Sequence, residues 1–132
     1  MGTIKKDLEE LTSLGKSGAS FEGLQVFPSH SFPGSLVVTL HCTEFTCRCP
    51  MTHQPDWANI EIVYKPDKYI VETKSVKLYF EQFRDVGMFH EHLAQHVCDD
   101  FVAVLSPISL SVTVRFKTRG GISVDATAEY YT

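Results

Sequence analysis

The sequence predicts an α+β domain: an antiparallel sheet with two helices on one face, in the order β-β-α-α-β-β. Four segments alternate apolar and polar residues with the period of two that is typical of strands. Between the second and third of them, two segments place apolar residues three and four positions apart, as amphipathic helices do. An antiparallel sheet that carries its helices on one face buries both kinds of apolar surface.

The first two strand segments, 36–40 and 60–64, flank a polar stretch that contains two prolines. If that stretch closes a hairpin, the two strands are antiparallel neighbours. The apolar residues on one face of these strands are Leu36, Val38 and Leu40, followed by Ile60, Ile62 and Tyr64.

The two helical segments follow, over about 75–84 and 89–105. We expect Gly87 to break the first helix and Pro107 to end the second, because neither residue supports a continuing helix. The residues expected on the buried stripes are Val76, Tyr79, Phe80 and Phe83 in the first helix, and Phe89, Leu93, Val97, Phe101 and Leu105 in the second.

The last two strand segments cover 110–116 and 122–130, and Arg119-Gly120-Gly121 makes the turn between them. The sheet still carries Val37, Val63 and Tyr131 on its other face. Sheets of this kind often close into rings with copies of themselves, so we expect a homo-oligomer.

We interpret residues 1–132 as a single domain with an irregular N-terminal lead-in over 1–31, in which 3–15 forms a short, weakly held helix at best. The net charge of −4 and the dispersed lysines and arginines argue against a broad nucleic-acid surface. No apolar run is long enough to span a membrane, and the charged start lacks the apolar core of a secretory signal. We therefore expect a cytoplasmic protein whose four cysteines are reduced.

The stretch Glu44–Trp57 is the first that could carry chemistry. It places Cys49 before Pro50 and Asp56 after Pro55, in a segment that we interpret as a rigid, irregular loop. Such a loop can aim a nucleophile and a proton donor at one substrate atom. The alternative is a tight turn with a buried cysteine.

The run VETKSVKLYF, residues 71–80, passes from strand into helix, with Thr73 or Ser75 as the expected N-cap. Lys74 and Lys77 lie near the positive end of this helix and could bind phosphate with its free amides. The alternative is a solvated helix face. Glu72 could pair with Lys74 or accept hydrogen bonds from the N–H groups of a ligand.

Two further stretches contribute candidate residues. In FHEH, Glu91 lies in the first helical turn, where it either complements the helix dipole or accepts from the N–H groups of a guanine-like edge, and His90 precedes it. In TRGGIS, Arg119 stands beside two glycines that could wrap closely around a phosphate or ribose. The alternative is that this stretch serves only as a hairpin turn, which by itself explains the two glycines.

Together these stretches resemble one family. The chain resembles the NADPH-dependent nitrile reductases that convert 7-cyano-7-deazaguanine to 7-aminomethyl-7-deazaguanine, a precursor of queuosine in tRNA. The motifs that carry the resemblance are CP followed by TxQPD and Ala58, then ExKSxKLY, FHE and RGGIS. The resemblance runs from about Phe32 to Tyr130 and is to the short, single-module form. It implies the tunnelling fold (T-fold), in which rings of subunits have their sites at subunit junctions.

The resemblance also implies roles. Cys49 would be the nucleophile that forms a covalent thioimide with the nitrile carbon, and Asp56 the acid that protonates the nitrile nitrogen. The deazaguanine would be held by Val71, Glu72, Thr73, His90 and Glu91. NADPH would be contacted by Thr73, Lys74, Lys77, Arg119 and Gly120.

The chemistry constrains the protonation of the two catalytic residues. The thiol must be ionised to attack, so its pKa should lie below the usual value of about 8.5. A neighbouring carboxylate would raise that pKa instead. Asp56 therefore fits better as a protonated donor whose own pKa is lifted by burial. Which of the two groups holds the proton at rest is open at this point.

The sequence departs from the family at three places. Thr73 stands where Ser is frequent, and it keeps a hydroxyl. His53 replaces the more usual Gly between Thr52 and Gln54, which adds a titratable group near Cys49. Cys47 is an additional cysteine to which we assign no role.

Two alternatives have the same fold. A zinc cyclohydrolase is one, since cysteines and histidines cluster here, but C-x-C before Pro is a poor match to zinc-ligand spacings, and we expect no metal. A non-catalytic domain that binds pterins or purines is the other. It would not need Cys49 and Asp56 together. The residues considered for zinc are His41, Cys42, Cys47, Cys49 and His53.

Overall fold

The computed structural model describes residues 21–132, and the helix expected over 3–15 lies outside them. The predicted order is present, with two short strands added. The elements are β1 (Val26–Pro28), β2 (Val38–Arg48), β3 (Pro55–Lys65), β4 (Tyr69–Val71), α3 (Thr73–Glu81), α4 (His90–Leu105), β5 (Ser109–Phe116) and β6 (Asp125–Tyr131).

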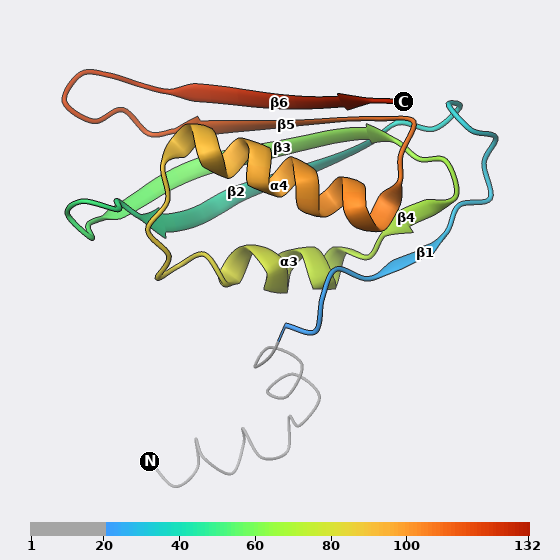
Figure 1. The fold of residues 1–132 in the computed structure, drawn as a ribbon, viewed down its shortest axis with the longest axis horizontal. Helices are drawn as coiled ribbons and strands as arrows, with labels where there is room; N and C mark the ends of the chain where they lie inside the picture. Colours follow the sequence, from blue (N-terminus) through green and yellow to red (C-terminus); the bar gives the residue numbers. More distant parts are fainter. Residues whose placement is uncertain (1–20) are drawn as a thin grey trace, which may run out of the picture.

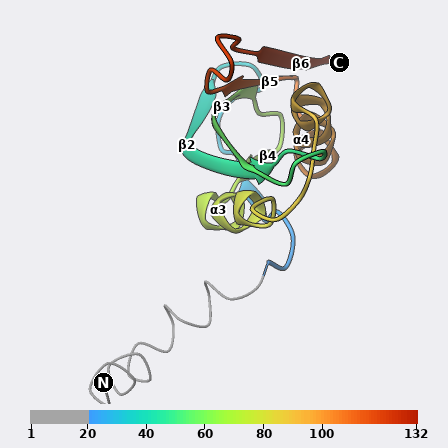
Figure 2. The same ribbon diagram turned by 90° about the vertical axis from the view of Figure 1, so that its left-hand side faces the viewer.

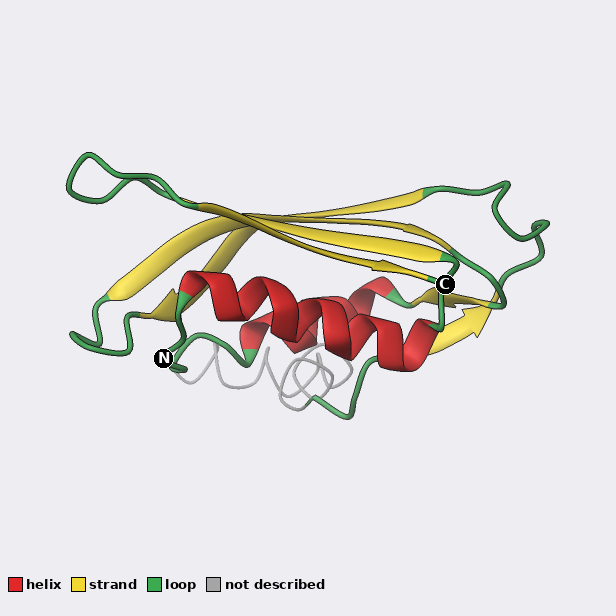
Figure 3. Cartoon of the chain, turned by 45° about the horizontal axis from the view of Figure 1, so that its top comes forward, coloured by secondary structure: helices red, strands yellow, loops and turns green. Residues whose placement is uncertain are grey.

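The main sheet is antiparallel throughout, in the order β2-β3-β5-β6. Both helices cover one face of it, as Figure 3 shows, and the view along the long axis shows the strands curving from β6 to β2 (Figure 2). The added strands β1 and β4 form a second, two-stranded sheet near the start of α3 (Figure 1). The predicted α+β class is therefore confirmed.

The core lies between the sheet and the helices. α4 packs on β5 and β6, while α3 packs on β2. The residues of both predicted helical stripes are buried except Phe89. That exception corrects the prediction: Phe89 has an extended backbone as the N-cap of α4, and its ring is 53% exposed. α4 thus begins at His90. Within residues 21–132, no helix is long and apolar enough to span a membrane.

The start of α3 also differs from the prediction. Glu72, rather than Thr73 or Ser75, is its N-cap, and the Glu72 carboxylate accepts from the backbone N–H groups of Lys74 at 2.7 Å and Ser75 at 2.8 Å. The carboxylate satisfies amides that the helix leaves unpaired and complements the dipole. These two amides are therefore not free for a phosphate.

α3 ends at Glu81, before the predicted break at Gly87. Residues 82–86 continue as tight turns, in which four backbone N–H groups donate to the carbonyl three residues earlier, those of Gln82, Phe83, Arg84 and Val86. Such turns frequently follow the end of an α-helix. The segment from Gln82 to Met88 then runs back to the loop between β2 and β3.

The prediction that Glu44–Trp57 is irregular is wrong, because most of this stretch belongs to β2 and β3, and β2 contains a β-bulge. Cys42 pairs with Ile60 and Phe45 with Ala58, so two residues of β2 oppose one residue of β3. The bulge shifts the alternation of β2 by one position, and Phe45 and Cys47 consequently face the core. Strand pairing continues as far as Arg48 and Pro55, and the loop is confined to residues 49–54.

The turn between β5 and β6 is the predicted one. Arg119 and Ile122 exchange backbone hydrogen bonds of 2.9 and 3.0 Å around Gly120 and Gly121, whose φ angles of 59° and 79° suit glycine. β6 begins at Asp125 rather than at residue 122, and Ile122 is exposed. The turn extends past the end of the main sheet (Figure 1).

Candidate active site

Asp56 is the buried carboxyl group around which the site is built. It lies in β3 in phase with core residues Ala58 and Ile60, and only 2% of it is exposed. The Arg119 Nη1 donates to Asp56 Oδ1, and the His90 Nε2 lies 3.3 Å from Oδ2. A guanidinium has no acceptor, so Oδ1 must accept. A proton held by Asp56 would therefore sit on Oδ2, facing His90.

His90 and Arg119 approach Asp56 from different elements. His90 is the first residue of α4. Its ring stacks on the ring of Phe116 in β5, with the ring centroids 3.5 Å apart and the ring planes at 8° to each other. Arg119 comes from the β5–β6 turn, and its Nη2 also donates to Gln54 Oε1 at 2.8 Å. A strand, a helix and a turn thus converge on one carboxylate.

Cys49 lies next to this cluster, at the start of the 49–54 loop. Its backbone N–H donates to the Gln54 carbonyl at 2.9 Å, and its carbonyl accepts from the His53 N–H at 2.9 Å. The Thr52 hydroxyl, followed by the backbone amides of Thr52 and Met51, lowers the pKa of Cys49, while burial and then the Asp56 charge raise it more weakly. The direction agrees with what a nucleophilic thiol requires.

The other three cysteines behave differently. Burial raises the pKa of the Cys47 thiol to about 11, with contributions from Asp56 and Cys49. Burial also raises the pKa values of Cys42 and Cys98. All four cysteines are free thiols, and Cys49 is the one whose pKa is lowered. A lowered pKa is typical of reactive cysteines and a raised one of buried structural cysteines, so Cys49 remains the candidate nucleophile.

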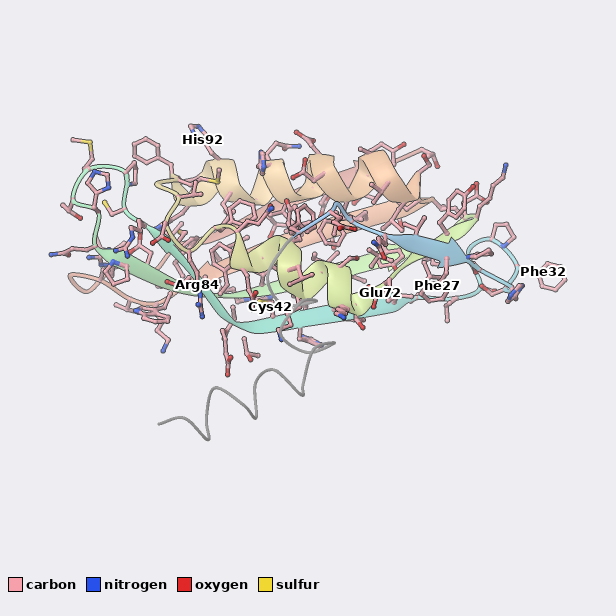
Figure 4. All side chains as sticks on the ribbon, turned by 90° about the horizontal axis from the view of Figure 1, so that it is seen from below. Phe27, Phe32, Cys42, Glu72, Arg84 and His92 are labelled. Atoms are coloured by element: carbon pink, nitrogen blue, oxygen red, sulfur yellow. The ribbon has the colours of Figure 1, made fainter. Side chains whose placement is uncertain are left out.

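The remaining predicted residues divide between two parts of the fold. Glu91 is exposed in the first turn of α4, and Gly120 is exposed in the turn that carries Arg119, so both lie at the Cys49 end. The β4–α3 junction lies toward the other end of the long axis (Figure 1). Figure 4 shows Glu72 there, and His92, near the start of α4, away from it. The predicted residues at the β4–α3 end are Val71, Glu72, Thr73, Lys74 and Lys77.

Two grooves lie along β2. One, of about 350 Å³, runs between β2 and α3 and is lined in part by Thr73, Lys77 and Arg84. The other, of about 630 Å³, lies over the bulge and is lined in part by Arg48 and Asp85. Neither groove is lined by Cys49 or Asp56. Figure 4 shows Cys42 and Arg84 on the α3 side of the sheet.

Sequence reasoning missed three residues of the site. Gln54 orients Arg119, and its position in the TxQPD motif was a usable signal. Phe116 supports His90, but as an apolar strand residue it gave no signal. Arg48 bonds to the His53 carbonyl and stands outside the matched motifs. As for zinc, residues 21–132 contain no group of three Cys, His, Asp or Glu side chains close enough to hold a metal ion.

Comparison with known proteins decides the family. Residues 55–132 match the family model described as "QueF-like protein", which is more than half of the chain. The chain belongs to the QueF-like family. Those residues include Asp56, His90, Glu91 and Arg119, so the match covers the carboxylate and both of its partners.

Curated relatives of this QueF-like chain are named "NADPH-dependent 7-cyano-7-deazaguanine reductase". The protein of that name from Frankia casuarinae is 50% identical over 121 residues, which cover 91% of this chain and 95% of the relative. The one from Syntrophus aciditrophicus is 45% identical over 128 residues, which cover 97% of this chain and 91% of the relative.

A solved structure confirms the fold. The archaeosine synthase QueF-Like in its apo form superposes with a TM-score of 0.66 over 70% of this chain and 91% of that one, at 24% identity. At that identity the likeness concerns the fold alone. It bears out the predicted tunnelling fold, with antiparallel strands and two helices on one face.

Proposed function

We propose that this chain is an NADPH-dependent oxidoreductase that reduces the nitrile of 7-cyano-7-deazaguanine to the aminomethyl group, through a thioimide on Cys49. The observation that carries the proposal is the pairing of Cys49, a thiol of lowered pKa, with the buried carboxylate of Asp56 on the facing strand. The names of the relatives supply the substrate and the cofactor. Reduced thiols and NADPH both fit a cytoplasmic enzyme, and the product would enter queuosine modification of tRNA.

The first step is addition of sulfur to carbon. The Cys49 thiolate forms a bond to the nitrile carbon, one C–N π bond opens, and the nitrogen takes a proton from Asp56. A nitrile is a poor hydride acceptor and a thioimide is a better one, so covalent addition divides a hard step into easier ones. Asp56 Oδ2, which faces His90, is the oxygen able to hold the proton, because Oδ1 accepts from Arg119.

Two reductions follow. NADPH, when bound, would supply one hydride in each of two rounds. With one hydride added to the thioimide carbon, the C–S bond would break and Cys49 would leave as the thiolate, and an imine would remain. A second hydride and a proton would convert the imine to the amine. In total the nitrile would take up two hydrides, from two NADPH, and two protons. Cys49 is released as the thiolate and Asp56 regains its proton from solvent, so the enzyme ends unchanged.

The residues present fit the cofactor. Lys74 and Lys77 are exposed on α3, and Thr73 and Lys77 line the groove between α3 and β2, where they could bind phosphate. At Gly120, nothing lies within 4 Å of where a Cβ would stand, so a ligand can approach its backbone closely. Arg119, which already pairs with Asp56 and Gln54, would then be shared with the cofactor.

The substrate would lie between carboxylates. Glu72 and Glu91 can accept from the N–H groups of the deazaguanine, while Val71, Thr73 and His90 complete its surroundings. The two oxygens of Glu72 each accept one amide of α3, and each keeps a lone pair for a ligand. The cap thereby holds the carboxylate in a fixed orientation.

We further propose that each site combines residues of two subunits in a homo-oligomeric ring. Its support is the separation, along one chain, of the β2–β3 loop and the start of α4 from the β4–α3 junction (Figure 1). Both edge strands of the main sheet, β2 and β6, are available to continue it into a neighbouring copy. A ring built this way repeats one junction around its axis.

The activity is tested by mixing the protein with 7-cyano-7-deazaguanine and NADPH and following the absorbance of the reduced cofactor. We expect two NADPH oxidised per nitrile and a mass increase of the intact protein equal to one substrate when the cofactor is withheld. Cys49→Ala should bind the nitrile without forming the adduct. An adduct that persists in Cys49→Ala, or no NADPH oxidation by the folded oligomer, would refute the proposal.

The shared junction has its own test. Cys49→Ala and Glu72→Gln should each be inactive alone. Hybrid oligomers assembled from equal amounts of the two variants should recover about a quarter of wild-type activity, because about one junction in four then joins an intact Cys49 to an intact Glu72. No recovery, in hybrids verified by mass spectrometry, would place both residues in one subunit's site.

A further inference from the structure

The six-residue loop that carries Cys49 has few contacts of its own. Within residues 49–54, two hydrogen bonds join backbone to backbone, both between Cys49 and the far side of the loop, and the Gln54 N–H donates weakly to the Thr52 hydroxyl at 3.4 Å. Residues 51–54 are exposed. A loop of this kind moves unless neighbouring groups hold it. The position of the Thr52 and Met51 amides around the Cys49 sulfur therefore depends on contacts from outside the loop.

Arg48 supplies such contacts. Its Nη1 donates to the His53 carbonyl at 2.9 Å, across the base of the loop. Its Nε and Nη2 donate to Asp85 Oδ1 at 3.3 and 3.2 Å, so one guanidinium joins the loop to the turn after α3. The planar donor fork of arginine suits a bridge between two fixed acceptors, which a lysine ammonium could not span in the same way.

The backbone beside Arg48 reinforces the junction. The Arg48 N–H donates to the Val86 carbonyl at 2.9 Å, and the Arg48 carbonyl accepts from the Met88 N–H at 3.1 Å. Gly87 lies between these bonds, against the loop: a Cβ there would stand 3.1 Å from the Pro50 Cα. The loop is thus held by its Pro50 side and, through Arg48, by its His53 side.

The carbonyl that Arg48 holds belongs to a strained residue. His53 has a φ of 59°, in the left-handed region, which costs a non-glycine residue energy. Without an external contact, His53 gains by leaving that conformation. Because the His53 N–H bonds to the Cys49 carbonyl, such a change would move the nucleophile's own backbone.

We propose that Arg48 is a positioning residue for Cys49: its guanidinium, anchored on Asp85, holds the His53 carbonyl and thereby keeps the loop amides directed at the Cys49 sulfur. The inference rests on the proposed function of Cys49 as the nucleophile. Arg48 need not touch substrate or cofactor. The ion pair with Asp85 is exposed and adds little stability by itself, so the effect is on loop geometry.

The positive charge of Arg48 is the competing explanation for an ionised Cys49. The other titratable or charged groups around the thiol are Asp56 and Cys47 on the strands, His53 in the loop, and His90 and Arg119, which both contact Asp56. Two substitutions separate geometry from charge. Arg48→Lys keeps the charge and breaks the bridge. Asp85→Asn removes a negative charge and weakens the anchor.

The experiment measures the rate at which iodoacetamide alkylates Cys49 in the full-length oligomer, as a function of pH, by peptide mass spectrometry. It needs no substrate, so its outcome is independent of whether the nitrile is reduced. We expect Arg48→Met to slow alkylation at neutral pH by about three- to tenfold and to move the midpoint upward, since the thiolate is the reacting form. Arg48→Lys and Asp85→Asn should move in the same direction.

Arg84→Met is the matched control, because Arg84 is an exposed neighbouring arginine in the turn after α3, and its profile should stay at wild type. If Cys49 is alkylated at the wild-type rate in Arg48→Lys, or faster than wild type in Asp85→Asn, the effect comes from charge and the proposal is overturned. Unchanged rates in all variants would overturn it as well. Both Arg48 and Asp85 have exposed side chains, so their variants should assemble normally.

Discussion

Arg119 and Asp56 are 63 residues apart in the chain, yet the guanidinium of one donates to the buried carboxylate of the other. The contact ties the β5–β6 turn to β3 at the end of the sheet where Cys49 lies. Of the cations available to Asp56, Arg119 is permanently charged, whereas His90 carries a charge only when protonated. Asp56 therefore depends mainly on Arg119 for a charged partner.

We expect Arg119→Met to reduce the free energy of unfolding by about 1–3 kcal/mol, because a buried carboxylate loses a charged hydrogen-bond donor. Urea unfolding at one fixed protein concentration measures this, since oligomer stability depends on concentration. Lys117→Met, an exposed neighbour on the same hairpin, should change stability by no more than about 0.5 kcal/mol. If both substitutions change the free energy of unfolding equally, the Arg119–Asp56 pair does not stabilise the fold.

Asp56→Asn tests the proton donor. The amide has nearly the same shape but cannot deliver an acidic proton, so turnover should fall by about 10²–10⁴-fold, the usual contribution of a positioned general acid. The affinity for the nitrile should change far less. Rapid-quench mass spectrometry of the Cys49 adduct measures the addition step directly. If the adduct forms in Asp56→Asn at the wild-type rate, another group protonates the nitrogen.

Thr52→Val tests the electrostatics of the nucleophile. The Thr52 hydroxyl is the main cause of the lowered Cys49 pKa, so its removal should move that pKa back toward the ordinary value of a thiol. In wild type, the pH midpoint of alkylation should lie lower for Cys49 than for Cys42, whose pKa burial raises. Peptide mass spectrometry reports both thiols at once. A Thr52→Val midpoint equal to that of wild type would assign the shift to other groups.

The fold was predictable because its strands and helices keep their periods. The buried stripe of α4 from Leu93 to Leu105 and the alternation in β5 need only local reasoning. Prediction failed where tertiary contacts override a local pattern. The bulge at residues 43–44 shifts the phase of β2, so that Cys47 faces the core, and no local feature of the sequence announces that shift.

The site was predictable in composition but not in geometry. Cys49 and Asp56 stand out as a thiol and a carboxyl flanked by prolines, yet the chain places Asp56 in a strand rather than in a loop. That Arg119 meets Asp56, and that Glu72 caps a helix, depend on contacts which spacing does not encode. Arg48 was missed because an arginine at a strand end has an ordinary solvated role in most proteins.

His53 has a φ of 59° at a position where the resemblance to the nitrile reductases implies glycine. Glycine adopts that conformation without the cost of about 1–2 kcal/mol that a Cβ imposes, but it also loses more freedom on folding. We therefore expect His53→Gly to raise the free energy of unfolding by about 0.5–1 kcal/mol, while His53→Val, which is β-branched, should lower it. Urea unfolding at one protein concentration ranks the three proteins. Because the imidazole is exposed and Arg48 contacts only the His53 carbonyl, neither substitution removes a side-chain bond. A His53→Gly protein less stable than wild type would mean that the loop is not strained at this residue.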